Sequence, residues 1–202
     1  MNRRYVVTGC VVLLVLALPL PGCAKHVPAL SRLTNSGFEQ PLDSGWVQTV
    51  VNDSSTSGYI ERSDTLGQPD SGFAVRVYKF HKQFCSLSQT VPLETLGQVV
   101  HFWGRFRIGA DVPCSPVAAV IFSYLDSADN RLGRTLYYLP TSYCTWTDSD
   151  SEHLVKLTDT AGQWTQYSLN FQSELDSFLP HVPQERIRQL RVELYACVDY
   201  SG

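Results

Sequence analysis

Several alternating segments place aromatic rings beside charged and hydrogen-bonding groups, a combination that suits carbohydrate recognition. Between positions 99 and 108, for example, polar and aromatic residues alternate with apolar ones and so share one face of an expected strand. Aromatic faces stack on sugar rings, and planar polar groups bind the hydroxyls at the ring edge. If the strands share one sheet, we expect ligand contacts from Trp103, Tyr78, Tyr195, Arg105, Arg76, His101 and Glu193.

The same residue types also allow a purely structural interpretation. In that case Trp103 and Tyr195 pack beneath loops, and Arg76 or Arg105 pairs with the Glu193 carboxylate. The sequence leaves both interpretations open, because alternation shows which face of a strand a residue occupies and not what lies against that face.

A polar loop carries two further aromatic candidates, Tyr143 and Trp146, on either side of Cys144. Held by a disulfide, such a loop presents its rings as one wall of a ligand site. The two rings serve equally well as a cover for the end of the fold. Both residues are therefore candidate ligand contacts.

Signals for catalysis or nucleic-acid binding are weak. The five histidines are scattered, and no serine has the Gly-x-Ser-x-Gly setting of a nucleophile elbow. A glycosidase needs two carboxylates about 5–10 Å apart, and most acidic residues here fall in turns. The formal net charge of −3 offers no basic footprint for nucleic acid. We therefore expect a protein that is not an enzyme and that needs no organic cofactor.

The elements that position these residues are short alternating segments separated by turn signals, as in an all-β sandwich. Such segments lie at 73–79, 99–108, 118–125, 134–139, 165–171 and 190–196. A turn-rich loop at 126–133 joins two of them as a hairpin, and at most one short helix or helical turn is expected, around 183–189.

Four cysteines follow position 23, and an even number in an exported chain predicts two disulfides. Cys114 and Cys144 lie symmetrically about the expected hairpin loop, so antiparallel pairing favours a bond between them. That choice leaves Cys85 with Cys197. The other two pairings remain open, because spacing alone does not decide among three connectivities.

Several motifs resemble family 4/9 carbohydrate-binding modules, which are β-jelly rolls of the galactose-binding type. The resemblance begins with the run at 33–39 and Ser44-Gly45-Trp46, and continues through the strands at 71–77, 88–91, 101–107, 162–171 and 190–194. It implies a jelly-roll module over residues 33–202 that binds polysaccharide without cleaving it. It also implies a structural calcium site as an option, for which Asn35 and Glu39 match the first half.

Members of that family usually end with one more strand, which returns beside the N-terminal strand. Here the chain stops at Gly202, where that strand would begin, so we expect an open sheet edge. Two alternative functions follow: a structural lipoprotein that pairs this edge with a protein partner, and an accessory domain of a glycoside hydrolase.

The N-terminus has the features of an export signal. A positive start at Arg3 and Arg4 precedes an apolar run that is too short to span a membrane, so residues 1–22 read as a signal peptide. The sequence Leu20-Pro21-Gly22-Cys23 resembles the lipobox of bacterial lipoproteins, which implies lipidation of Cys23 and a tether over 23–32. In the lipoproteins that the sequence resembles, an aspartate directly after the cysteine signals retention in the inner membrane. Ala24 stands at that position here, so the resemblance implies an outer-membrane location. Cleavage of a plain signal peptide nearby is the alternative.

Overall fold

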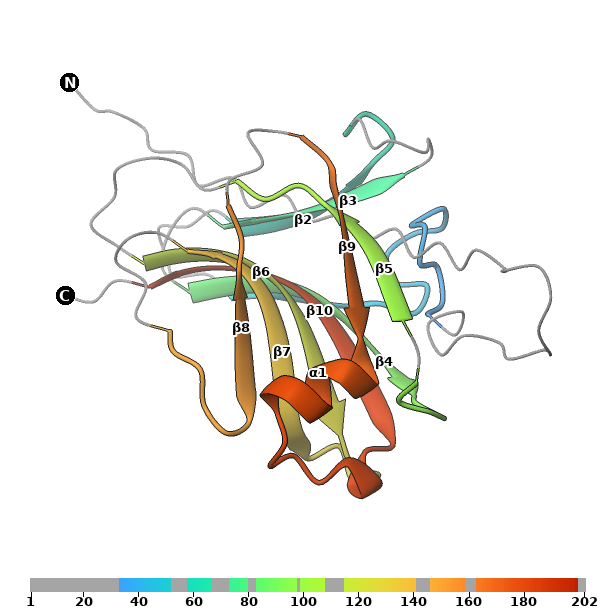
Figure 1. Cartoon of the computed structure of the whole chain (residues 1–202). Coiled ribbons are helices and arrows are strands. Elements are labelled where there is room, and N and C mark those ends of the chain that lie inside the picture. Colours follow the sequence, from blue (N-terminus) through green and yellow to red (C-terminus); the bar gives the residue numbers. More distant parts are fainter. Residues whose placement is uncertain are drawn as a thin grey trace.

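Two layers of β-strands enclose the main core of the protein (Figure 1). The computed structural model describes residues 33–51, 58–66, 73–79, 83–97, 99–107, 115–140, 146–158 and 163–199. The six-stranded sheet runs in the order β1 (Val47–Val50), β4 (Gln83–Pro92), β10 (Gln189–Asp199), β6 (Ser115–Leu125), β7 (Arg131–Pro140) and β8 (Glu152–Lys156). Two strand pairs form the opposite layer: β2 (Gly58–Ser63) with β3 (Ala74–Lys79), and β5 (Val99–Gly104) with β9 (Thr165–Asn170). The predicted all-β sandwich is confirmed.

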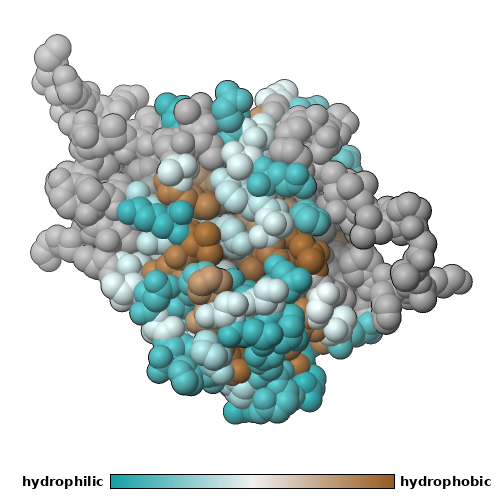
Figure 2. Space-filling model, in the orientation of Figure 1, coloured by the Kyte–Doolittle hydropathy of each residue, from teal (hydrophilic) through white to brown (hydrophobic). Residues whose placement is uncertain are grey.

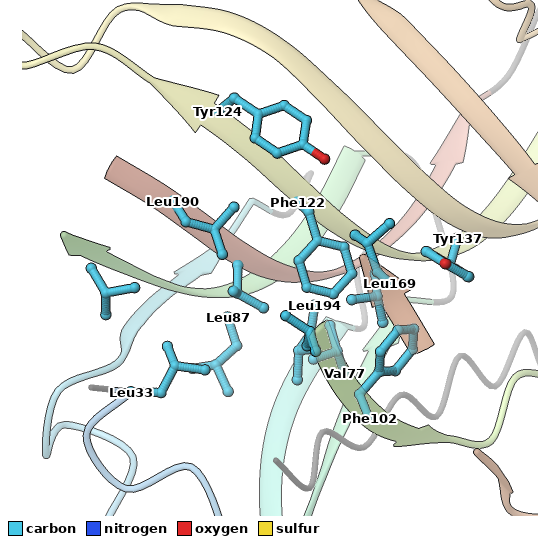
Figure 3. Close-up of a cluster of buried hydrophobic side chains, with 14 of the residues drawn as sticks. Leu33, Val77, Leu87, Phe102, Phe122, Tyr124, Tyr137, Leu169, Leu190 and Leu194 are labelled. Atoms are coloured by element: carbon cyan, nitrogen blue, oxygen red, sulfur yellow. The ribbon is translucent and has the colours of Figure 1, made fainter. Parts of the chain in front are cut away.

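Alternation along each strand sends one set of side chains into the space between the layers. Figure 3 shows residues of the six-stranded sheet facing residues of the other layer, such as Phe122 toward Phe102. The two rings lie 5.6 Å apart, and both side chains are fully buried. Inward-facing positions are apolar because their side chains pack in this core. Outward-facing positions do not have this constraint.

The outer face of the six-stranded sheet carries a second apolar cluster, here called the outer cluster. Its buried members come from β6, β7 and β10, and partly buried side chains pack around them. They are Val117, Ala119, Ile121, Leu136, Tyr138 and Cys197, with Phe84, Trp146, Leu154 and Tyr195 at the margin. One face of this sheet therefore packs on the main core, and part of the other face is also covered.

One α-helix, α1 (Phe171–Phe178), closes an end of the sandwich (Figure 1). We predicted a strand as far as position 171, but the chain turns at Asn170, whose side-chain oxygen accepts a hydrogen bond from the Ser173 backbone N–H at 2.9 Å. This bond caps the helix. Phe171 and Leu175, one turn apart, are both buried. The helical turn predicted around 183–189 is present as the 3-10 helix η2 (Gln184–Arg186).

The predicted disulfide between Cys85 and Cys197 is wrong. The register of β4 and β10 places Cys85 opposite Ala196, and Cys197 opposite Phe84. Successive strand residues point to opposite faces, so Cys85 lies in the main core and Cys197 lies in the outer cluster. No disulfide joins these two described cysteines.

β10 occupies the middle of its sheet, where it pairs with β4 on one side and with β6 on the other. Among the described strands of this sheet, the edges are β1 and β8. β1 is short, and Val47 and Val50 on it are 63% and 44% exposed. The described sheet thus leaves an apolar edge at its N-terminal strand.

Candidate functional site

The ligand-binding residues that we predicted do not form one continuous patch. Tyr78 and Arg76 lie on β3, in the layer of strand pairs, whereas Tyr195 and Glu193 lie on β10 of the six-stranded sheet. Inward-facing neighbours of both pairs pack in the main core, so the two pairs lie on opposite outer faces of the sandwich. The shared sheet on which the predicted patch depended is not present, and alternation along a strand does not reveal which strands lie side by side.

The first of these surfaces, here called the tyrosine face, consists of Tyr59, Glu61, Arg76 and Tyr78. The β2–β3 register places Tyr59 opposite Tyr78 and Glu61 opposite Arg76. The tyrosine rings stack with centroids 4.8 Å apart. Arg76 Nη1 lies 3.3 Å from Glu61 Oε2 and 3.5 Å from the Tyr59 hydroxyl. An aromatic stack and an ion pair therefore lie side by side on this surface.

Exposure differs sharply within the tyrosine face. Tyr59 is 40% exposed, whereas Tyr78 beneath it is buried. Burial, with a smaller contribution from Tyr59, raises the pKa of Tyr78 above its usual value. Tyr78 is therefore neutral near pH 7 and supports Tyr59, which is the ring accessible to a ligand.

A tryptophan extends this surface beyond Arg76. Ala74 lies two residues before Arg76 on the same side of β3 and forms a small apolar cluster with Leu66, against which Trp164 packs. The Arg105 guanidinium lies 5.3 Å above the Trp164 ring, a cation–π contact. Ala74 and Tyr78 are separated by four residues of strand, roughly 13 Å. Aromatic groups thus stand at both ends of a row that has the Arg76–Glu61 pair between them.

The second surface is the outer cluster, where Trp146 and Tyr195 lie together. Trp146 stacks on Tyr138 at 5.9 Å and approaches Tyr195 at 6.5 Å, and Phe84 stacks on the other side of Tyr195 at 5.5 Å. Burial, followed by the neighbouring Cys197 thiol, raises the pKa of Tyr195 above its usual value. These rings pack mainly on one another, so Trp146 acts here as a cover for the sheet.

The remaining predicted ligand residues are dispersed. Glu193 lies on the outer face of β10, opposite Ile121 of the outer cluster. His101 is exposed on β5. Trp103 belongs to the same strand, but its side chain lies outside the part that the structure describes. Cys23, Tyr143, Cys114 and Cys144 also lie outside the described residues.

Two residues of the tyrosine face, Tyr59 and Glu61, were not predicted as ligand contacts. The sequence signal was weak, because the three residues that follow Ile60 are all polar and break the alternation. Tyr59 and Glu61 join the tyrosine face because β2 pairs with β3 in this register. The register between two strands is a property of the folded sheet, so the sequence did not reveal it.

Within the described ranges, no three or more His, Cys, Asp or Glu side chains gather as metal ligands would. Asn35 and Glu39, expected at a calcium site, lie in a loop where the Asn35 side-chain oxygen and the Glu39 backbone carbonyl already accept hydrogen bonds from protein donors. No helix in the described part has the length and apolar character to cross a bilayer.

Comparison with known proteins adds no assignment. No family model matches the chain, and no curated protein is significantly similar to it. The candidate site therefore rests on its own geometry.

Proposed function

We propose that the protein is a non-catalytic module that binds a polysaccharide through the tyrosine face. The observation that carries the proposal is the stacked Tyr59–Tyr78 pair beside the Arg76–Glu61 ion pair. Tyr59 offers a ring for stacking on a sugar, and the adjoining guanidinium and carboxylate offer donors and acceptors for hydroxyl groups. The row from these residues to Trp164 suits an oligosaccharide segment better than a single sugar.

The proposal includes export and membrane attachment. The lipobox-like sequence that ends at Cys23 would anchor the module to the bacterial cell envelope, with the outer membrane as its address. A short tether would hold the tyrosine face close to the membrane, where envelope or external polysaccharides are encountered. A role as the accessory domain of a glycoside hydrolase uses the same surface.

The direct test is calorimetric titration of the protein without its signal segment against a panel of polysaccharides. Replacement Tyr59→Ala should weaken binding about threefold to tenfold, because it removes one stacking ring. Arg76→Met should weaken binding without unfolding the protein, because the pair that it breaks is exposed. Circular dichroism would verify that each variant keeps its fold.

A matched control is Phe178→Ala, which removes another exposed aromatic ring, from α1. Its binding should equal that of the parent protein. Binding that survives Tyr59→Ala and Arg76→Met but is lost in Trp146→Ala would move the site to the outer cluster. Absence of binding to every polysaccharide by the folded protein would argue against the proposed function.

One observation favours a second candidate function, a structural lipoprotein that pairs its sheet edge with a partner protein. β1 is an edge strand without a charged side chain, and its valines are exposed. Natural edges are usually protected by charges or bulges. Under this alternative, Val47→Lys should abolish cross-linking to the partner and leave polysaccharide binding unchanged.

A further inference from the structure

The loop that leads into β1 has a backbone that needs strong support. Asn35 and Phe38 have φ angles of 54° and 57°, in the left-handed region that residues other than glycine rarely adopt. Phe38 is nevertheless fully buried and lies 5.3 Å from the Trp46 ring. The family resemblance implies calcium as a means of holding such a loop, with Asn35 and Glu39 among its ligands.

An arginine from another strand occupies this role. Arg62 on β2 donates from Nε to the Phe38 carbonyl oxygen and from Nη2 to the Glu39 carbonyl oxygen. Its guanidinium also lies 3.3 Å from the centroid of the Phe73 ring. A planar cation therefore bridges two successive carbonyls of the loop and rests on an aromatic face.

Side-chain amides satisfy most of the other polar groups of the loop. Asn35 Oδ1 accepts from the Gln40 N–H at 2.8 Å, and Asn35 Nδ2 donates to the Gln40 and Pro41 carbonyls at 2.9 and 3.1 Å. The buried Gln89 bonds both the N–H and the carbonyl of Thr34, at 2.7 and 3.1 Å. The Asn35 side-chain oxygen and the backbone carbonyl oxygens of Thr34, Phe38, Glu39, Gln40 and Pro41 thus already accept hydrogen bonds from protein N–H groups.

We infer that Arg62 is a built-in cation that takes the place of calcium in this loop, so that the order of the loop does not depend on a divalent ion. Calcium requires six to eight oxygen ligands, at about 2.3–2.6 Å. The backbone carbonyl oxygens of Phe38 and Glu39 are bonded to the Arg62 guanidinium. The positive charge of this group would repel a metal ion placed beside them. The residues present do not fit the metal.

Two measurements on the protein test this inference. The melting temperature should be the same in a chelator and in millimolar calcium chloride. Arg62→Met should lower the melting temperature by roughly 4–10 °C, because two charge-assisted hydrogen bonds are lost. Hydrogen–deuterium exchange should rise in residues 34–46 more than elsewhere in this variant.

Arg62→Lys keeps the charge but lacks the fork that reaches both carbonyls, so it should fall between the parent and Arg62→Met. Arg191→Met serves as the matched control, since Arg191 is an arginine that bonds the Thr90 hydroxyl on the six-stranded sheet. A lower melting temperature in chelator would overturn the inference. So would exchange in residues 34–46 that is unchanged by both Arg62 variants. If Arg62→Met fails to fold, the inference is still tested by the melting temperature of the parent protein in chelator and in calcium chloride, and by the Arg62→Lys variant.

Discussion

Asp126 shows how one side chain organises a hairpin turn. Its Oδ1 accepts hydrogen bonds from the backbone N–H groups of Ala128 and Asn130 at 2.9 and 3.0 Å, and its Oδ2 lies 3.1 Å from Arg186 Nη2. The Asn130 side chain, followed by the Ala128 N–H, lowers the pKa of Asp126 below its ordinary value. The ionised carboxylate thus ties the β6–β7 turn to η2.

Because the pKa of Asp126 is lowered by folding, its ionised carboxylate stabilises the folded state fully above the ordinary aspartate pKa, near pH 4. This stabilisation is lost as the pH falls through the lower pKa that Asp126 has in the folded protein. Asp126→Asn should therefore reduce the melting temperature at pH 7, and the difference from the parent should shrink below about pH 4. Thermal unfolding across pH 3–8 would measure it. Asp129→Asn, an exposed change in the same turn, should have little effect at any pH. An equal difference at pH 3 and pH 7 would contradict the argument.

At the scale of an element, α1 is attached to the six-stranded sheet by a buried polar network. Glu174 on the helix accepts hydrogen bonds from the Thr135 hydroxyl at 2.8 Å and from His153 Nδ1. The Thr135 oxygen lies 3.1 Å from the Tyr124 hydroxyl, which donates to it because the Thr135 proton is already used. Burial, followed by the Glu174 charge, raises the pKa of nearby Tyr137 to about 12. These groups join three strands to one helix.

Removing the acceptor at the centre of this network should be costly. Glu174→Ala removes the carboxylate that accepts the proton of the buried Thr135 hydroxyl, and we expect a loss of about 1–3 kcal/mol in the free energy of unfolding. Urea denaturation would measure the loss. Ser177→Ala, on the exposed side of the same helix, is the matched control and should be nearly neutral. A Glu174→Ala variant as stable as Ser177→Ala would show that the network contributes nothing to the helix attachment.

The six predicted strand segments lie close to observed strands, whereas β1, β2 and β8 were not predicted, and neither, apart from the β6–β7 hairpin, were the pairing partners of the strands. The alternation around Val75, Val77 and Phe102 predicts strands, because their inward faces are buried in the core. The same alternation marks both Tyr78 and Tyr195 as outward, yet it gives no information on which layer each strand joins. α1 was missed because Phe171 continues the apolar alternation of Leu169, and only the cap at Asn170 distinguishes the helix start.

At the scale of the whole molecule, the six-stranded sheet separates two apolar regions. The main core lies between the layers, and the outer cluster lies on the opposite face of the sheet. Figure 2 shows mostly hydrophilic side chains at the end of the molecule that carries α1, with apolar ones gathered nearer the middle of that view. Exposure of the main core therefore requires separation of the layers, which is close to global unfolding.

Cys85 is a natural probe of that separation. Its side chain is fully buried in the main core, and burial raises the pKa of its thiol, which is only partly offset by Lys79. Alkylation at neutral pH should therefore be roughly a thousandfold slower in the native protein than in the denatured one, and should accelerate in urea with the midpoint of global unfolding. Peptide mass spectrometry, with Cys85→Ala to verify the assignment, would follow this one thiol. Labelling that is fast in the native state and insensitive to urea would mean that the layers open locally around β4, and that the sandwich is not one cooperative unit.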